Sequence, residues 1–167
     1  MADWFKAILD EVTTLVEATW TDVAAIGVML QQDSLTRNVV SQFTRAGNSD
    51  ATAIAPPWAI IGMGKAIPET EVGVDSYFYR LPCRIWYVGN VANSTDTDTT
   101  PSTQEFYAFK ANQLLAAFRT GAFATFEVFG DDIGQVDSSV DVGFADEGLT
   151  VYCSALAFEK GLLSKVA

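Results

Sequence analysis

The stretch YFYRLPCRIWYVGN, residues Tyr77–Asn90, decides the fold because its side chains alternate in character along an extended run. One set of alternate positions is apolar or amphipathic, as on the core face of a strand: Tyr79, Leu81, Cys83, Ile85 and Tyr87. The opposite positions mix apolar and basic side chains: Phe78, Arg80, Pro82, Arg84, Trp86 and Val88. The stretch therefore predicts a long strand with one buried face and a second face of undecided role.

Pro82 constrains where this strand lies in its sheet. Proline has no amide hydrogen, so in a central strand it would delete a hydrogen bond of the ladder. We therefore expect either an edge strand or a β-bulge at Pro82. An edge position would suit a strand that meets another subunit.

One helix is predicted before this strand in the sequence and one after it. Residues 5–19 carry apolar side chains at helical spacing, and Asp3 is a suitable N-cap. Ser102 and Glu105 have capping-box spacing and mark the start of the second helix, which ends before Gly121. Its apolar stripe is Tyr107, Ala111, Leu114 and Phe118, widened by Phe106, Phe109 and Leu115.

Further strands are predicted at Trp58–Met63, Ala124–Gly130, Gln135–Phe144 and Leu149–Phe158. The last two should pair as a hairpin through the turn at Ala145–Gly148.

Three connecting segments complete the chain. Val23–Leu30 is either a buried strand or a short helix, and residues 65–76 form a loop or a hairpin arm. Residues 90–103 form a polar linker. The sequence predicts a single α+β domain over residues 1–167, with a mainly antiparallel sheet of about four to five strands and two principal helices packed on it.

The composition offers little for catalysis. The chain has no histidine, so Ser-His and Cys-His nucleophile pairs and the common zinc sites cannot be built. Cys83 and Cys153 are expected to be buried and unpaired. The segment GMGKAI, Gly62–Ile67, lacks the third glycine and the helix of a dinucleotide loop, which favours a turn. We expect no enzyme, no cofactor and no metal site.

The charge of −11 excludes further classes of function. A protein that grips nucleic-acid phosphates, or a basic helix on a membrane surface, needs clustered lysine and arginine. No apolar run is long enough to span a bilayer, and the N-terminus has no signal-peptide pattern, so we expect a cytoplasmic location and no membrane partner. Two acidic pairs, Asp96 with Asp98 and Asp131 with Asp132, are cation ligands or, as their patterns favour, solvated turns.

Five segments taken in order carry a resemblance to a known family. They are DWFKAILDEVTTLVEAT, PPWAIIG, YFYRLPCRIWYVGN, STQEFYAFKANQLLAAFR and VDVGFADEGLTVYCSALAFEKGLL. In element order and hydrophobic rhythm the chain resembles the tail terminator, or tail completion, proteins of long-tailed bacteriophages and related gene-transfer particles. The region Trp20–Ala53 is longer than the family pattern.

The resemblance implies a structural virion protein of the neck, at the head–tail junction, assembled in the host cytoplasm. Such subunits form a hexameric ring that caps the tail tube, ends its polymerisation and joins the tail to the head connector, while DNA passes through the lumen. The family has no catalytic residues to transfer. Two alternatives are a head-completion or adaptor protein of the neck, and a small-ligand-binding α+β domain with a pocket between the aromatic strand and the central helix.

Two sets of residues are candidates for roles in such a ring. Aromatic and arginine side chains are enriched in interface cores, which makes one set a candidate subunit interface: Phe78, Arg80, Arg84 and Trp86. The other reading of this face is that a helix covers it and the arginines extend to solvent. Acidic side chains along a channel would repel DNA phosphates, and the candidate lumen acids are Asp96, Asp98, Asp131, Asp132 and Asp137.

Overall fold

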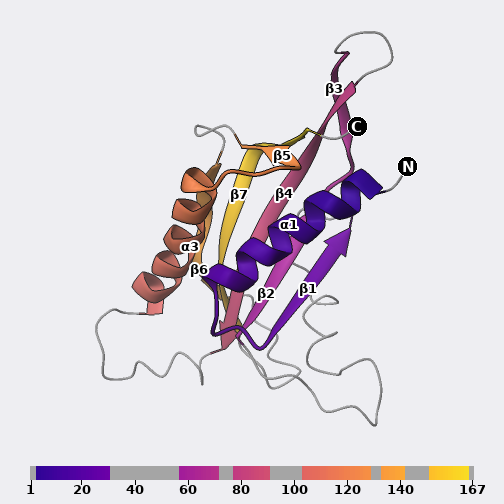
Figure 1. Cartoon of the computed structure of the whole chain (residues 1–167). Coiled ribbons are helices and arrows are strands. Elements are labelled where there is room, and N and C mark those ends of the chain that lie inside the picture. Colours follow the sequence, from indigo (N-terminus) through magenta and orange to yellow (C-terminus); the bar gives the residue numbers. More distant parts are fainter. Residues whose placement is uncertain are drawn as a thin grey trace, which may run out of the picture.

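The structure, a computed structural model, describes residues 3–30, 57–71, 77–90, 103–128, 133–141 and 151–165 (Figure 1). Its helices are α1 (Asp3–Thr19) and α3 (Thr103–Thr120). Its strands are β1 (Ala25–Leu30), β2 (Trp58–Met63), β3 (Ile67–Glu71), β4 (Tyr77–Asn90), β5 (Phe126–Glu127), β6 (Ile133–Asp141) and β7 (Val151–Ser164).

The strands form one sheet in the order β1-β2-β4-β7-β5, with β3 paired to β4 and β6 paired to β7. The α+β class is confirmed. The sheet is mixed, because β1 runs parallel to β2 while the other pairs are antiparallel. The described residues contain seven strands, more than the four to five predicted. The two additional strands are β1 and β3. The sequence left the segment of β1 open between a strand and a helix, and the segment of β3 open between a loop and a hairpin arm.

β4 lies in the centre of the sheet, so the predicted edge position is wrong. The other prediction, a bulge at Pro82, is confirmed by the register of β4 with β7. Its pairing with β7 shifts around Pro82, since Leu81 lies opposite Leu162 but Cys83 lies opposite Phe158. The missing amide hydrogen of Pro82 therefore falls where the ladder is already interrupted. The carbonyl of Pro82 accepts a hydrogen bond of 2.7 Å from the amide of Gly64.

Gly161, in the bulged segment of β7, has a φ of 80°, which only glycine adopts without strain. A Cβ atom at Gly161 would lie 2.6 Å from the carbonyl oxygen of Leu81. Positive φ and close backbone approach thus both require glycine beside Pro82.

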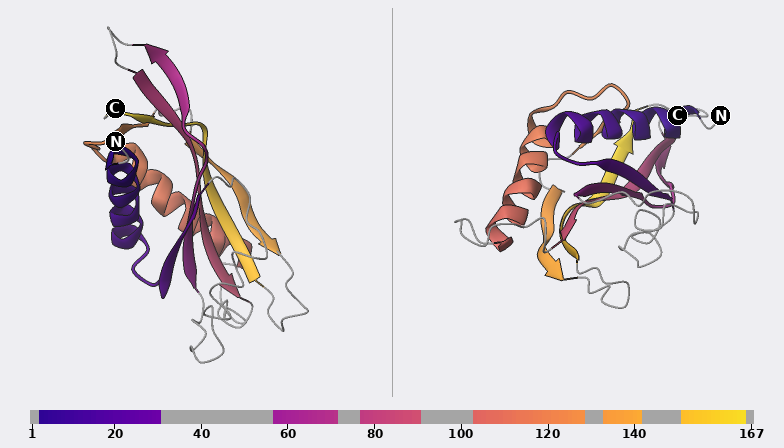
Figure 2. Two further views of the ribbon diagram at one scale, coloured as in Figure 1. Left: turned by 90° about the vertical axis from the view of Figure 1, so that its right-hand side faces the viewer. Right: turned by 90° about the horizontal axis from the view of Figure 1, so that it is seen from below.

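Both helices lie on one face of the sheet, where the core forms (Figure 2). The core face predicted for β4 is confirmed, since Leu81, Cys83, Ile85 and Tyr87 all belong to this core and Tyr79 is half-buried. The helices contribute Ile8, Val12, Val16, Leu114 and Phe118, and β7 contributes Leu156, Phe158 and Leu162. Phe109 does not widen the stripe of α3 as predicted, because it is 56% exposed.

Some element boundaries follow the sequence and others do not. The strand predicted at Ala124–Gly130 is only the short β5, Phe126–Glu127, and the strand predicted to end at Phe158 continues as β7 to Ser164, because its second half pairs with β4 and β5. α1 begins at Asp3, and β2 and β4 have the predicted bounds. Residues 25–30 form a strand, which resolves the ambiguity at Val23–Leu30. β6 and β7 pair antiparallel, as expected of the predicted hairpin, whereas its turn at Ala145–Gly148 and the residues of the capping box before Thr103 lie outside the described residues.

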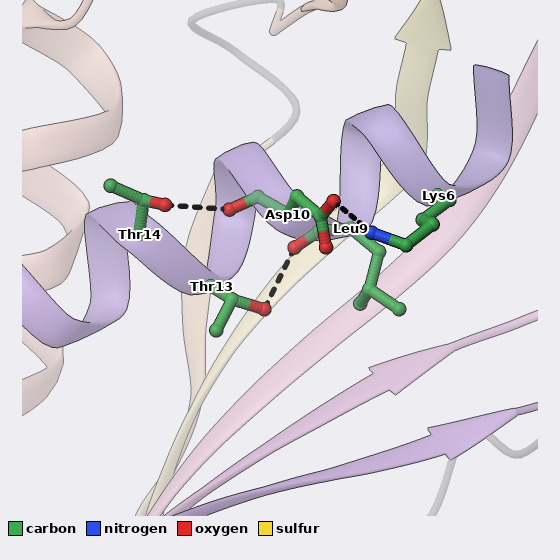
Figure 3. Close-up of polar contacts among 5 residues, drawn as sticks. All are labelled: Lys6, Leu9, Asp10, Thr13 and Thr14. Atoms are coloured by element: carbon green, nitrogen blue, oxygen red, sulfur yellow. Dashed lines mark hydrogen bonds and ion pairs between the residues drawn. The ribbon is translucent and has the colours of Figure 1, made fainter. Parts of the chain in front are cut away.

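The outward side of α1 is stabilised by local contacts (Figure 3). Lys6 forms an ion pair of 2.5 Å with Asp10, one turn later, and the hydroxyls of Thr13 and Thr14 donate to the carbonyls four residues earlier. Because the Lys6–Asp10 pair is exposed, its contribution to stability is small, on the order of 0.5 kcal/mol.

Candidate functional site

The second face of β4 is less open than a free interface would be. Trp86 is 2% exposed and Val88 is fully buried, and their partners on β2, Ile60 and Trp58, are fully buried too. Arg80 and Arg84 are half-buried. The backbone of Phe78 pairs with Thr70, and its side chain lies outside the described part of the structure. Of the candidate interface residues, the two arginines are therefore the ones shown to reach the surface, and the interface itself stays a prediction.

The candidate lumen acids are mostly beyond what the structure describes. Asp96, Asp98, Asp131 and Asp132 lie outside the described residues. Asp137 belongs to β6, where its backbone lies opposite Ala155 next to a shift of register. The lumen assignment thus stays a prediction.

A polar cluster that the sequence did not predict joins three elements. The carboxylate of Asp22, between α1 and β1, accepts a hydrogen bond of 2.6 Å from the hydroxyl of Tyr87 and lies 3.0 Å from the ammonium of Lys110 on α3. The indole of Trp20 donates a bond of 2.9 Å to the carbonyl of Lys110. We call Asp22, Tyr87 and Lys110 the Asp22 cluster.

Two opposing influences act on the pKa of Asp22. Partial burial tends to raise it, but hydrogen bonds from Tyr87 and Lys110 and the positive charge of Lys110 outweigh burial and hold the pKa of Asp22 below its ordinary value. Lys110 also lies 5.2 Å from the centre of the Tyr87 ring, so the cluster fixes α3 against β4. Only one feature of the sequence could have pointed to this cluster: Tyr87 was expected in the core, where its hydroxyl needs a hydrogen-bond partner, but the sequence does not identify that partner.

Glu11 of α1 holds the segment that follows α3. Its carboxylate accepts hydrogen bonds from the amides of Ala124 and Thr125, at 2.8 Å and 3.0 Å, and from the hydroxyl of Thr125. Lys165 approaches the same segment, where its amide donates to the carbonyl of Thr125 and its ammonium to that of Phe123. The end of α3 is thereby fixed to both α1 and the end of β7.

Two surface hollows lie near these contacts. One, of about 400 Å³, is bounded by the end of α1 and by β1, with Glu17, Trp20, Ile26 and Val28 among its walls. The other, which we call the α3 hollow, measures about 260 Å³ and has aromatic walls with charged residues: Phe118, Arg119, Phe123, Phe126, Glu127 and Lys165.

The space between β4 and α3, where a ligand pocket was one alternative, is filled by core side chains. Leu114 and Phe118 are buried there with Ile85 of β4, and the ring centres of Phe118 and Phe158 lie 4.8 Å apart. Both described hollows open elsewhere on the surface.

β3 and the paired start of β4, Tyr77–Arg80, extend beyond the rest of the described sheet (Figures 1 and 2). We call this two-stranded ribbon the arm. Its root is anchored, because Trp4 stacks on Tyr79 with ring centres 4.9 Å apart and the amide of Tyr79 donates a 3.0 Å bond to the buried hydroxyl of Ser164. Ile67, at the start of β3, is 51% exposed.

Other site chemistry is sparse in the described ranges. No group of three or more histidine, cysteine, aspartate or glutamate side chains gathers there in a way that could hold a metal ion. Neither α1 nor α3, the helices described, is long and apolar enough to cross a membrane. Cys83 is a free, buried thiol whose pKa is raised by burial, as expected of a structural cysteine. The side chain of Cys153 lies outside the described residues.

No protein-family model matches this chain, and no curated protein matches it in sequence.

Proposed function

We propose that this protein is a structural subunit of a ring at the head–tail junction of a phage-like particle, where it caps the tail tube and joins it to the head connector. The element order behind the resemblance supports this proposal. The initial helix, the short strand, the long aromatic strand, the central helix and the closing strand pair correspond to α1, β2, β4, α3 and β6–β7. Its partners would be further copies of itself, the tube protein and the connector.

The observation that carries the proposal is the arm. A two-stranded ribbon is marginally stable by itself, and this one extends from the sheet with Ile67 half exposed. Each subunit of a ring needs two different adhesive surfaces, because neighbours meet head to tail. A projecting ribbon with a rigid root is well suited to be one of them.

The net charge of −11 fits a protein that DNA passes without binding. Like charges repel, so an acidic lumen would keep DNA phosphates from adhering to the wall. In the proposed role the protein sits in the neck of the virion after assembly in the host cytoplasm, and it acts without catalysis.

The test is assembly of the purified full chain, alone and with tail tubes of the same particle. Native mass spectrometry and negative-stain images should show a hexameric ring, in solution or at one end of each tube. Tubes polymerised with the protein present should be shorter than tubes polymerised without it. A monomer that neither forms rings nor caps tubes would contradict the proposal, and a ring that binds the connector without limiting tube length would instead indicate an adaptor of the neck.

A further inference from the structure

We infer that the arm of one copy docks on the α3 hollow of a second copy, which gives the proposed ring its head-to-tail contact. This inference deepens the proposed function and rests on it. Three observations carry it: the positions of the two surfaces, their apolar character and their charges.

The two surfaces lie at opposite edges of the sheet and at the same level along it. Ile67 of the arm pairs with Arg80, and Arg80 pairs with Leu163 of β7. Leu163 pairs in turn with Glu127 of β5, in the wall of the α3 hollow. This row crosses four strands, so the surfaces are about 14 Å apart at a strand spacing of about 4.8 Å.

Complementary surfaces on opposite sides of a subunit generate a head-to-tail assembly, and such an assembly closes into a ring when the rotation per subunit allows it. The arm continues past the end of the sheet along the direction of β4, so it projects from the rest of the subunit (Figure 2). The placement is therefore that of a head-to-tail contact rather than of a two-fold dimer.

Both surfaces expose apolar groups. Ile67 is one of three large apolar side chains that are strongly exposed among the described residues. Of the three phenylalanines that line the α3 hollow, Phe123 is half-buried and offers apolar surface, while Phe118 and Phe126 are buried. The volume of the hollow, about 260 Å³, far exceeds what one water requires. Moving Ile67 from water into these walls would be favourable, because each square ångström of apolar surface removed from water contributes about 25 cal/mol.

The charges are complementary as well. The chain has 10 basic and 21 acidic residues, yet Arg119 and Lys165 both border the α3 hollow, with Glu127 as its one acidic lining residue. β3 contributes Glu69 and Glu71 by sequence. Arg80, at the root, is the basic residue of the arm, and Lys65 lies just before β3. The acidic strand of the arm thus suits the basic side of the hollow.

Cross-linking between two variants, each with one added cysteine, tests the contact directly. Ile67→Cys places a thiol on the arm, and Ala122→Cys places one at the exposed rim of the hollow. A bis-maleimide should join the two variants when they are mixed, at least about tenfold more than the control mixture of Ile67→Cys with Ala18→Cys, an exposed position on α1. Unchanged protein, which retains Cys83 and Cys153, gives the background.

Two results would overturn the inference. One is cross-linking no greater than in the control mixture. The other is efficient self-cross-linking of Ile67→Cys alone, which would indicate that two arms meet in a two-fold dimer or that the arm has another site.

Charge reversal on the arm tests the arm contact independently of the proposed ring. Glu69→Lys with Glu71→Lys should weaken association about tenfold or more, and adding Arg119→Glu should restore part of it. The control Asp10→Lys with Glu17→Lys changes the net charge equally, from −11 to −7, at exposed positions of α1.

The readout is the subunit mass of each variant by native mass spectrometry. Rings that form equally well in the arm variant would contradict the arm contact but leave the proposed ring standing. Cross-links with filaments or dimers, and no ring or capped tube, would confirm the contact and contradict the proposed function.

Discussion

Pro82 lies within β4, one of the two longest strands described, and two neighbouring glycines make this tolerable. Gly64 on one side and Gly161 on the other approach the backbone of residues 81–82 so closely that a Cβ on either would lie within 3 Å of it or of the proline ring. The bulge thus depends on the absence of two side chains on the neighbouring strands as well as on the proline.

Replacement of Gly161 by alanine should therefore be costly. The substitution combines a φ of 80° with a contact of 2.6 Å to the carbonyl of Leu81, so we expect the free energy of unfolding to fall by about 1–3 kcal/mol. Urea unfolding followed by tryptophan fluorescence measures the change. Gly27→Ala, in the regular strand β1, is the matched control, and an equal effect of both substitutions would show that the bulge has no special requirement.

The two kinds of residue on the second face of β4 should respond differently to substitution. Trp86→Ala removes a side chain that is only 2% exposed, so we expect a loss of about 3–5 kcal/mol in the free energy of unfolding. Arg84→Glu, at a half-buried position, should cost much less. Thermal and urea unfolding of both variants measure this contrast. Because Trp86→Ala endangers the fold, a test of this face as a subunit interface should change Arg84 and retain Trp86.

At the scale of elements, α3 is fixed by polar contacts in its first half and just after its end. The Asp22 cluster joins its first half to β4 and to the end of α1, and Glu11 holds the segment just after it. Both contacts come from residues distant in sequence, so they set the position of α3 on the sheet rather than its helicity.

The Asp22 cluster should make stability depend on pH. The pKa of Asp22 in the folded protein lies below its ordinary value of 3.8, so its stabilisation is fully present well above pH 3.8 and is lost as the pH falls through the folded-state pKa. Asp22→Asn should lower the free energy of unfolding by about 1 kcal/mol or less at pH 7, since Asp22 is partly exposed, and by a smaller amount near pH 3. Urea unfolding from pH 7 to pH 3 measures the difference.

Asp10→Asn is the control for this prediction, because the Lys6–Asp10 pair is exposed and lies within one helix. A difference between Asp22→Asn and the unchanged protein that stays constant with pH would mean that the ionised form of Asp22 has no role.

The elements differ in how far the sequence could predict them. Alternation identified β4 with its bounds, because it has enough residues for its period to be seen. β2 was predicted instead as a short apolar run that follows Pro56 and Pro57, and all six of its residues are buried. The parallel pairing of β1 and the central position of β4 escaped prediction, because the choice of a partner strand depends on contacts distant in sequence. The Asp22 cluster and the α3 hollow escaped it for the same reason.

For the whole molecule, the acidic charge is the property most directly related to the proposed role. Replacement of Asp96, Asp98, Asp131, Asp132 and Asp137 by asparagine should increase retention of DNA in the channel, because repulsion of the phosphates is reduced. Electrophoretic binding assays at low salt and measurements of DNA ejection from assembled particles check this. Asp10→Asn with Glu17→Gln, on the exposed side of α1, is the control.

If the variant with all five substitutions binds DNA and ejects it as the unchanged protein does, the assignment of these acids to the lumen is wrong. The result would not depend on the arm, because none of the five residues belongs to it.

The pairing of β4 with β7 also has a consequence for the order of synthesis. Arg84 lies opposite Ala157, and the root of the arm is anchored by Ser164, so a ribosome has made most of the chain before β4 acquires its second neighbour. Until then the nascent hairpin of β2 and β4 has one open edge, and contacts this distant in sequence make folding slow. In the proposed ring, a half-translated subunit would therefore have no anchored arm to offer a neighbour, and translation itself would delay assembly until the subunit can fold.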